Sequence, residues 1–301
     1  MGKKIWQHYL AYILNRPGIR NVCSPKWYLQ MRYYERFGKY IDFKNPTTFN
    51  EKLQWLKVYQ RKSIQSIMVD KYEVRKYIKD KIGEEYLIPL VGGPWKSEQD
   101  IELNELPEKF VLKCTHDSGS VVICKNKSEF DWEKAKRKLR KGLDYNMYWY
   151  GREWPYKNVR PQIIAEKYME DSNTYKTEGI FDYKLFCFNG ECKIFKIDFD
   201  RFTRHGANYY DSKTKELLEF GEEVCLPDFS RKLVIPKQID EMIELAEKLS
   251  KDFLFLRVDF YVVGEKIYFG ELTFFPGSGF VKFIPGEWDN RLGQWCKLKN
   301  E

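Results

Sequence analysis

A pattern near the C-terminal end of the chain predicts a β-hairpin whose turn is centred on Glu265. Two mostly apolar runs flank this turn, and a Gly and a Lys beside the glutamate are typical of a short loop between strands. With this centre, Asp259 lies opposite Glu271, and Arg257 lies opposite Thr273. Because side chains alternate between the two faces of a strand, all four are expected on one face of a sheet.

The predicted pair of Asp259 and Glu271 needs a positive partner, because two carboxylates directly opposite each other repel. Oxygen ligands at this spacing suit a hard cation, above all Mg²⁺ bound together with the phosphates of a substrate. Arg257 on the same face offers a fork of donors for a phosphate or a developing oxyanion. The alternative is an ion network of these three side chains on a solvated sheet face, which antiparallel sheets commonly have.

A second charged feature is Lys113, near the end of an apolar strand predicted at 110–114. Lysine is rarely buried without a partner, so this position needs an explanation. A small polar loop follows, and its backbone N–H groups can surround phosphate oxygens while the ammonium adds a point charge. The loop consists of Thr115, His116, Asp117, Ser118, Gly119 and Ser120. It is not a Walker P-loop, because the spacing GxxxxGK[ST] is absent, and a plain turn carrying a surface histidine is the alternative.

The other patterns along the chain predict an α+β fold built from antiparallel hairpins. The first 84 residues read as mostly helical, and Thr48 with Glu51 is the signature of a capping box at a helix start. Asn189-Gly190 is a favoured two-residue turn between strands predicted at 183–188 and 193–198.

Composition limits the partners without choosing one. The formal net charge of +8 suits a polyanion such as a phosphorylated nucleotide, an acidic glycan, a nucleic acid or a membrane surface. Seven cysteines without a CxxC pair argue against a disulfide framework or a structural zinc site and favour a reducing cytoplasm. No apolar run approaches the roughly 20 residues of a membrane helix. No transmembrane segment is therefore expected, and only peripheral membrane contact through the N-terminal stretch stays open.

The order of these features resembles the ATP-grasp superfamily, and most closely its TupA-like branch, which is associated with bacterial surface polysaccharides. The resemblance spans roughly residues 46–292 and rests on several phrases: Phe49-Asn50-Glu51-Lys52-Leu53-Gln54-Trp55, Asp70-Lys71-Tyr72, Asp182-Tyr183-Lys184 and Phe188-Asn189-Gly190. It implies an ATP-grasp fold, in which the antiparallel sheets of two lobes clasp a nucleotide. Residues 1–84 would form a helical N-terminal region, 85–165 the first lobe with the phosphate-loop hairpin, and 166–301 the second lobe with the metal-binding hairpin.

The resemblance also implies roles for individual residues. Lys113 and Arg257 would be catalytic. ATP would be bound by Lys71, Lys113, Thr115, His116, Asp117, Ser118, Gly119, Ser120, Glu166, Lys167, Tyr168, Met169 and Lys184. Mg²⁺ would be bound by Asp259, Glu271 and Thr273. The third metal ligand of the family is usually Asn, and Thr273 offers only a hydroxyl, so the number of metal ions stays open.

The activity that the resemblance implies is ligation of a carboxylate to an amine through an acylphosphate. The acid would be an acidic sugar or polymer and the amine an amino acid or other amine, in the biosynthesis of a bacterial surface polysaccharide such as a capsule. Residues that could hold the acid are Arg201, Arg204, His205 and Lys184.

Three other functions remain as alternatives. Phosphotransfer to a sugar hydroxyl would use the same ATP site, whereas glycosyl transfer lacks support because no convincing DxD motif for a nucleotide sugar is present. A basic polyanion-binding module is the non-enzyme alternative, since aromatic residues and lysines interleave at 145–156. Nucleic acid is not the expected partner, because basic residues spread along the chain instead of forming a recognisable motif.

Overall fold

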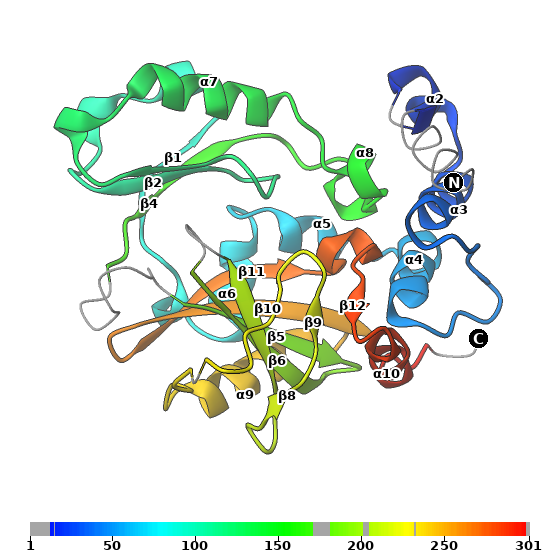
Figure 1. The fold of residues 1–301 in the computed structure, drawn as a ribbon. Coiled ribbons are helices and arrows are strands. Elements are labelled where there is room, and N and C mark those ends of the chain that lie inside the picture. The colour runs from blue at the N-terminus through cyan, green and yellow to red at the C-terminus, as the bar shows by residue number, and fades with distance from the viewer. Residues whose placement is uncertain (1–12, 15, 171–180, 201–204, 232, 299–301) are drawn as a thin grey trace.

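The computed structural model describes residues 13–14, 16–170, 181–200, 205–231 and 233–298 of the 301-residue chain. A four-stranded and a six-stranded sheet lie one above the other, with α5 and α6 between them and longer helices on their outer sides (Figure 1). Neighbouring strands within both sheets are antiparallel. The predicted α+β class is confirmed.

The helices are gathered in the first half of the chain, with two more near its end. They are α2 (Pro17–Val22), α3 (Pro25–Phe37), α4 (Phe49–Tyr59), α5 (Ile64–Val69), α6 (Val74–Lys81), α7 (Trp132–Leu143), α8 (Tyr148–Gly151), α9 (Ile239–Ser250) and α10 (Glu287–Trp295). The predicted capping box is present at α4, where the Thr48 side chain accepts from the Glu51 N–H and the Glu51 carboxylate accepts from the Thr48 N–H.

The four-stranded sheet has the order β1–β4–β2–β3. Its strands are β1 (Leu90–Trp95), β2 (Phe110–Cys114), β3 (Val121–Cys124) and β4 (Ile163–Lys167). Its outer face packs on α7, where buried Leu139 joins Leu112 and Ala165 in a small apolar core. The sheet thereby holds Lys113 and Glu166 on neighbouring strands, with Lys113 paired to Ile164 and Glu166 paired to Val111.

The six-stranded sheet has the order β11–β10–β5–β6–β7–β8. Its strands are β5 (Asp182–Phe188), β6 (Glu191–Phe199), β7 (Gly206–Asp211), β8 (Leu217–Leu218), β10 (Phe255–Val263) and β11 (Lys266–Thr273). Two short strands, β9 (Gly221–Glu222) and β12 (Phe283–Ile284), pair beside it. The Asn189-Gly190 turn joins β5 to β6 as predicted, with both residues at positive φ.

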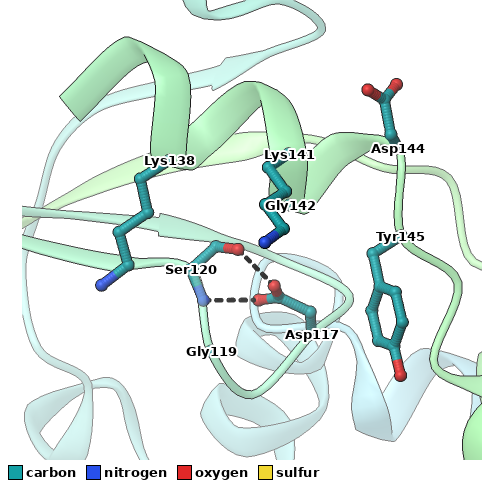
Figure 2. A pocket seen from close by; sticks show the side chains of 8 residues that line it. All are labelled: Asp117, Gly119, Ser120, Lys138, Lys141, Gly142, Asp144 and Tyr145. Carbon is teal, nitrogen blue, oxygen red and sulfur yellow. Dashed lines mark hydrogen bonds between the residues drawn. The ribbon is translucent and has the colours of Figure 1, made fainter. Parts of the chain in front are cut away.

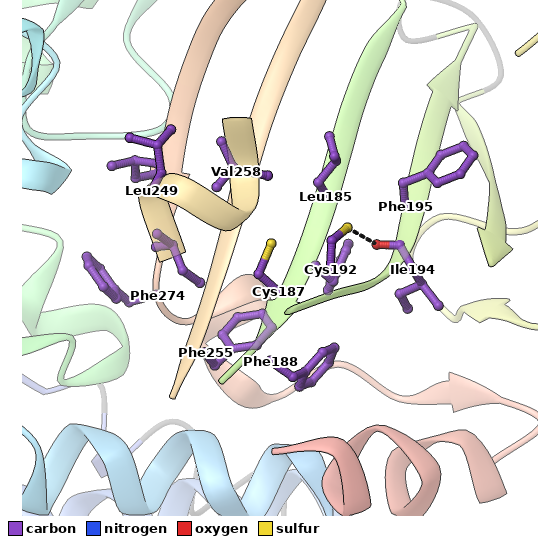
Figure 3. Close-up of a cluster of buried hydrophobic side chains, with 14 of the residues drawn as sticks. Leu185, Cys187, Phe188, Cys192, Ile194, Phe195, Leu249, Phe255, Val258 and Phe274 are labelled. Carbon is purple, nitrogen blue, oxygen red and sulfur yellow. Dashed lines mark hydrogen bonds between the residues drawn. The ribbon is translucent and has the colours of Figure 1, made fainter. Parts of the chain in front are cut away.

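The main hydrophobic core lies against the six-stranded sheet and explains why its two faces differ. Leu185, Phe195 and Val258 lie on the face covered by α9, beside Leu249 of that helix (Figure 3). Leu185 and Val258 are each next in sequence to a charged residue, Lys184 and Asp259 respectively. Because neighbouring side chains point to opposite faces, the charged residues are turned toward the four-stranded sheet.

The helix α4 belongs to the same core. Phe49 at its start packs on Phe188 and Phe255, with ring centroids 5.6 and 4.8 Å apart. The side-chain amide of Asn50 donates to the Val281 carbonyl at 2.8 Å, which ties the helix to the segment after β11. All seven cysteines are free thiols. Within the described part of the chain, each helix is too short or too polar to cross a membrane.

Candidate active site

The predicted carboxylate pair is formed by β10 and β11. Asp259 lies opposite Glu271 and Arg257 lies opposite Thr273, as the sequence predicted. The predicted turn is wrong, however: Val263 pairs with Lys266, so the loop is the two-residue turn Gly264-Glu265. A bulge next to Asp259 restores the predicted register, because Phe260 pairs with Phe269 and Gly270 is left as the extra residue.

Arg257 lies between the two carboxylates. Its Nε is 2.7 Å from Asp259 Oδ1, and its Nη2 is 2.7 Å from both Asp259 Oδ2 and Glu271 Oε1. The Thr273 hydroxyl donates to Glu271 Oε1 at 3.0 Å. The ion network that the sequence left as an alternative is therefore present, with Asp259 buried at 2% exposure and the Glu271 side chain 40% exposed.

Neighbouring charges set the acid–base properties of the two carboxyls apart. Burial raises the pKa of Asp259 to about 7, although the Arg257 and Lys184 cations oppose this shift. Burial would also raise the pKa of Glu271, but Arg257 and Lys71 together hold it below its usual value. Asp259 is thus the carboxyl whose ionisation most needs further positive charge.

A row of buried charges extends from Asp259 across the six-stranded sheet and was missed from the sequence. Lys184 lies opposite Asp259 with its Nζ 3.8 Å from Asp259 Oδ2, and it also pairs with Asp182 and, at 2.9 Å, with Asp198. Next in the row, Lys196 lies 3.4 Å from Asp198 and 3.3 Å from Glu222. Alternating polar residues in β5 and β6 were the only signal in the sequence. Lys184 is thus enclosed by carboxylates.

Lys113 and Glu166, on the four-stranded sheet, form a second charged group. Lys113 Nζ lies 2.5 Å from Glu166 Oε2. Arg75 of α6 lies 3.6 Å from the other oxygen of Glu166 and also donates to the Ile88 carbonyl at 2.9 Å. The strand lysine therefore has a carboxylate partner, which explains how its charge is tolerated beside an apolar strand.

The small polar loop is held by its own hydrogen bonds. Asp117 accepts from the Ser120 N–H at 3.3 Å and also from the Ser120 hydroxyl. Lys71 reaches under the loop: its N–H donates to the Thr115 carbonyl at 2.9 Å and its ammonium donates to the Asp117 carbonyl. Ser118 and Gly119 at the tip are exposed. The tip is therefore accessible to a ligand, while hydrogen bonds hold the two ends of the loop in place.

His116 differs from the surface histidine that the sequence left as an alternative, because it is buried at 3% exposure. Its Nε2 lies 3.1 Å from the Gly142 carbonyl and 2.9 Å from the Tyr145 carbonyl. These contacts anchor the loop to the end of α7. We assign His116 a structural part in shaping the loop, because its side chain is used by the protein itself.

The segment after Glu166 leads out of the four-stranded sheet. The Lys167 N–H donates to the Pro89 carbonyl at 2.9 Å, and its side chain is exposed. Tyr168 and Met169 follow as half-buried residues, and the Lys125 ammonium lies 5.8 Å from the Tyr168 ring. These three residues stay candidates for contact with the adenine. Arg201 and Arg204 lie outside the described residues.

The two sheets approach each other at a narrow crevice. Lys71, Ser118 and Tyr156 line it together with Gly270 and Glu271 of β11. In the sequence, Tyr156 stood out only as the last residue of the aromatic and basic stretch 145–156. Three segments that are far apart in the chain thus meet at this crevice. They contribute the Lys71 ammonium, the loop residue Ser118 and the Glu271 carboxylate.

A larger cavity, of about 400 Å³, lies on the other side of the loop and away from the carboxylates. Lys138 and Lys141 of α7 line it together with Gly119, Ser120 and Tyr145 (Figure 2). Lys138 already donates to the Val121 carbonyl at 2.7 Å. Its size does not make it the reaction centre, because the paired carboxylates are not among its lining residues.

One further group has the composition of a metal site. Single ligand atoms of Asp198, His205 and Cys225 lie within 4.8 Å of one another. Both Lys184 and Lys196 already pair with Asp198. The group lies at the far end of the charged row from the Asp259–Glu271 pair, and we do not assign a metal ion to it.

Comparison with known proteins identifies the class. A family model described as TupA-like ATPgrasp matches residues 51–297, which places the fold in the ATP-grasp superfamily. The chain belongs to the TupA-like ATP-grasp family, as its sequence predicted. No curated protein matches the chain in sequence.

Solved structures of other ATP-grasp proteins are similar at low identity. D-alanine–D-alanine ligase from Helicobacter pylori is 18% identical, with 82% of this chain and 68% of that chain covered and a TM-score of 0.42. L-amino acid ligase from Bacillus licheniformis is 13% identical, with 84% and 58% covered and a TM-score of 0.46. D-alanine–D-alanine ligase from Bacillus anthracis complexed with ATP is 15% identical, with 69% and 53% covered and a TM-score of 0.38. The chain thus spans little more than half the length of the last two proteins.

Proposed function

We propose that this protein is an ATP-dependent ligase that joins a carboxylate to an amine through an acylphosphate. The observation that supports this most is the crevice lined by Lys71, the loop residue Ser118 and Glu271 of the carboxylate pair. Cations and loop amides on one side suit phosphates, and carboxylates on the other side suit the metal that accompanies them. Membership of an ATP-grasp family agrees with this division of roles.

The residues present fit a magnesium ion. Asp259, Glu271 and Thr273 offer two carboxylates and a hydroxyl on neighbouring positions of one hairpin, an all-oxygen set of the kind that Mg²⁺ prefers. Mg²⁺ on these residues would neutralise charge on the phosphates of ATP. Asp259 is buried and needs positive charge to ionise, which supports its assignment as a metal ligand.

The side chains of this protein would act mainly through position and charge. Lys113 and Lys71 would hold phosphate oxygens, and the exposed tip of the loop would close over them with its N–H groups. Arg257 would stabilise the oxyanion that forms when an amine attacks the acylphosphate. Its guanidinium is already fixed by two carboxylates, so little reorganisation would be needed.

The substrates that we propose are an acidic sugar or polymer and an amino acid or other amine, in the cytoplasmic biosynthesis of a bacterial surface polysaccharide. The net charge of +8 supports an acidic partner. Lys184 and His205 were candidates for holding the acid, but both pair with carboxylates: Lys184 with Asp182 and Asp198, and His205 with Asp198. These pairs favour parts in the charged row instead.

The first experiment is calorimetry of ATP binding with and without Mg²⁺, followed by a screen of uronic acids and amino acids with hydroxylamine as the nucleophile. A ligase gives Mg²⁺-dependent ATP binding, free phosphate and a hydroxamate with at least one acid. A folded protein that does not bind ATP overturns the proposal. If ATP is converted to ADP in the presence of a sugar and no free phosphate appears, the protein is a kinase instead.

A further inference from the structure

Asp198 and His205 form a pair at the far end of the buried charged row. Asp198 lies at the end of β6 and is only 5% exposed. His205 immediately precedes β7, and its Nε2 lies 3.3 Å from Asp198 Oδ2. The imidazole side chain is 39% exposed, so it reaches the surface of the site while its carboxylate partner stays buried.

The surroundings fix both the charge of Asp198 and the orientation of the imidazole. Burial would raise the pKa of Asp198, but Lys196, the hydrogen bond from His205 and Lys184 hold it well below its usual range. A carboxylate accepts hydrogen bonds, so Nε2 of His205 carries the proton that faces Asp198. Nδ1 of the neutral imidazole is then the nitrogen that can accept a proton.

The Asp198–His205 pair is linked through Lys184 to the carboxylate pair of Asp259 and Glu271. The ammonium of Lys184 is 2.9 Å from Asp198 Oδ2 and 3.8 Å from Asp259 Oδ2. One cation therefore contacts both the carboxylate that orients His205 and the carboxylate that we assign to Mg²⁺. Asp198 and Asp259 share one face of the sheet, so an amine bound beside His205 would lie on the face where the acylphosphate would form.

The charge of this face suits a cationic substrate group. Among the ion pairs that the structure describes along the row, five carboxylates face three cations; they are Glu271, Asp259, Asp182, Asp198 and Glu222 against Arg257, Lys184 and Lys196. The Cys225 thiol beside this end is neutral, since burial raises its pKa to about 11. At the end of the row next to His205, the three carboxylates of Asp182, Asp198 and Glu222 outnumber the two ammonium groups of Lys184 and Lys196, which favours binding of an ammonium group there.

We propose that His205, oriented by Asp198, is the general base that removes a proton from the ammonium group of the amine substrate. Nδ1 accepts this proton, and the neutral amine nitrogen attacks the acyl carbon. The bond from this carbon to the phosphate oxygen breaks, and phosphate leaves with the electron pair and takes up the second amine proton. An ammonium nitrogen has no free electron pair and cannot attack. The step therefore supplies the neutral amine, which residues that act only by position and charge do not provide. This inference rests on the proposed function.

Hydroxylamine tests the ligase activity separately from the role of His205 as a base. It is largely unprotonated near neutral pH, so it can attack the acylphosphate without a general base. The experiment compares the parent with His205→Asn, using the acid that gives hydroxamate in the screen and either hydroxylamine or L-alanine as nucleophile. We expect the variant to keep its rate of hydroxamate formation and to lose about 100-fold or more in ligation of L-alanine. Its ligation rate should recover as the pH rises toward the pKa of the amine, and added imidazole should rescue His205→Gly.

Two results overturn the assignment of His205 while leaving the proposed function intact. One is an equal loss of both reactions, which would mean a role in forming the acylphosphate or in the structure. The other is an unchanged rate of ligation with L-alanine. If the parent itself gives no hydroxamate with any acid, the proposed function fails, and the role of His205 in it fails with it.

Discussion

Arg257 holds both oxygens of the Asp259 carboxylate, with two N–O distances of 2.7 Å. The two residues are two positions apart on β10, so the strand itself presents them side by side on one face. Asp259 is buried, and its other cationic neighbour, Lys184, is 3.8 Å away. Arg257 therefore serves the stability of the protein as well as the chemistry that we propose.

The first prediction concerns this guanidinium. Arg257→Ala leaves the Asp259 carboxylate buried without its bidentate partner, and removing one partner of such a pair costs about 3–5 kcal/mol in the free energy of unfolding. Arg257→Lys keeps a positive charge but loses the fork, so we expect a smaller loss of stability. Urea denaturation measures both. Equal stability of the parent and Arg257→Ala would contradict the prediction.

The second prediction is a difference in pH dependence between the two carboxyls. Because burial raises the pKa of Asp259 to about 7, the native state binds a proton that the unfolded state releases above about pH 4. The contribution of Asp259 to stability is therefore highest at low pH and falls as the pH rises toward 7. Glu271 has a lowered pKa, so its contribution is present at neutral pH and is lost on acidification.

Thermal or urea denaturation of Asp259→Asn and Glu271→Gln between about pH 3 and pH 8 tests this difference. Relative to the parent, Asp259→Asn should gain stability as the pH rises, and Glu271→Gln should gain stability as the pH falls. Because metal binding needs the ionised carboxylate, binding of ATP with Mg²⁺ to the parent should also strengthen from about pH 6 to pH 8 and release protons. Parallel curves for the two variants would contradict the opposite shifts.

The third prediction separates Lys113 from an ordinary surface lysine. Lys113→Met should weaken ATP binding by about 10- to 100-fold, which is the loss of one charge-assisted hydrogen bond. Stability should change little, because Arg75 remains 3.6 Å from Glu166. Lys109→Met is the matched control: Lys109 lies just before the same strand and pairs with exposed Glu170 at 2.9 Å. Calorimetry should find its affinity for ATP unchanged, and a similar loss in both variants would mean nonspecific charge.

The strands of the two main hairpins in the six-stranded sheet could be predicted from the sequence, but the two bulges that set their registers could not. The pairing of Asp259 with Glu271 was predicted from alternation, but through a turn one residue too long; the extra residue Gly270 offsets this difference. In the β5–β6 hairpin the turn was predicted correctly, and a bulge changes the register that this turn would set. The Asn189-Gly190 turn alone would place Lys184 against Phe195, whereas the extra residue Lys193 shifts the register and places Lys184 against Lys196.

Register shifts of one residue are not visible in a period-two pattern, because each strand still alternates on both sides of the bulge. The buried charged row was therefore missed even though strands at the positions of β5 and β6 were predicted. The approach of Lys71 to Glu271 was also out of reach as a geometric result, since it depends on packing between segments 200 residues apart. The buried state of His116 has the same cause, because its partners are carbonyls at the end of α7.

The last prediction tests whether the Gly270 bulge positions the carboxylate pair. A Cβ added at Gly270 would lie 3.0 Å from the Asp259 carbonyl oxygen and 3.0 Å from a ring carbon of Tyr261, which is closer than side chains ordinarily approach. Gly270→Ala should therefore displace β10 at Asp259, costing about 1–3 kcal/mol in the free energy of unfolding and weakening Mg²⁺-dependent binding of ATP.

The matched control lies in the same hairpin. Gly264 has a φ of +61° but open space around an added Cβ, so a side chain there meets no neighbour and strains only the turn itself. Gly264→Asn should consequently keep ATP affinity while it lowers stability by about 1–2 kcal/mol through the turn alone. Urea denaturation and calorimetry of both variants decide the point. If Gly270→Ala binds ATP with Mg²⁺ as tightly as Gly264→Asn does, the bulge does not set the geometry of the carboxylates, and their positions depend on Arg257 alone.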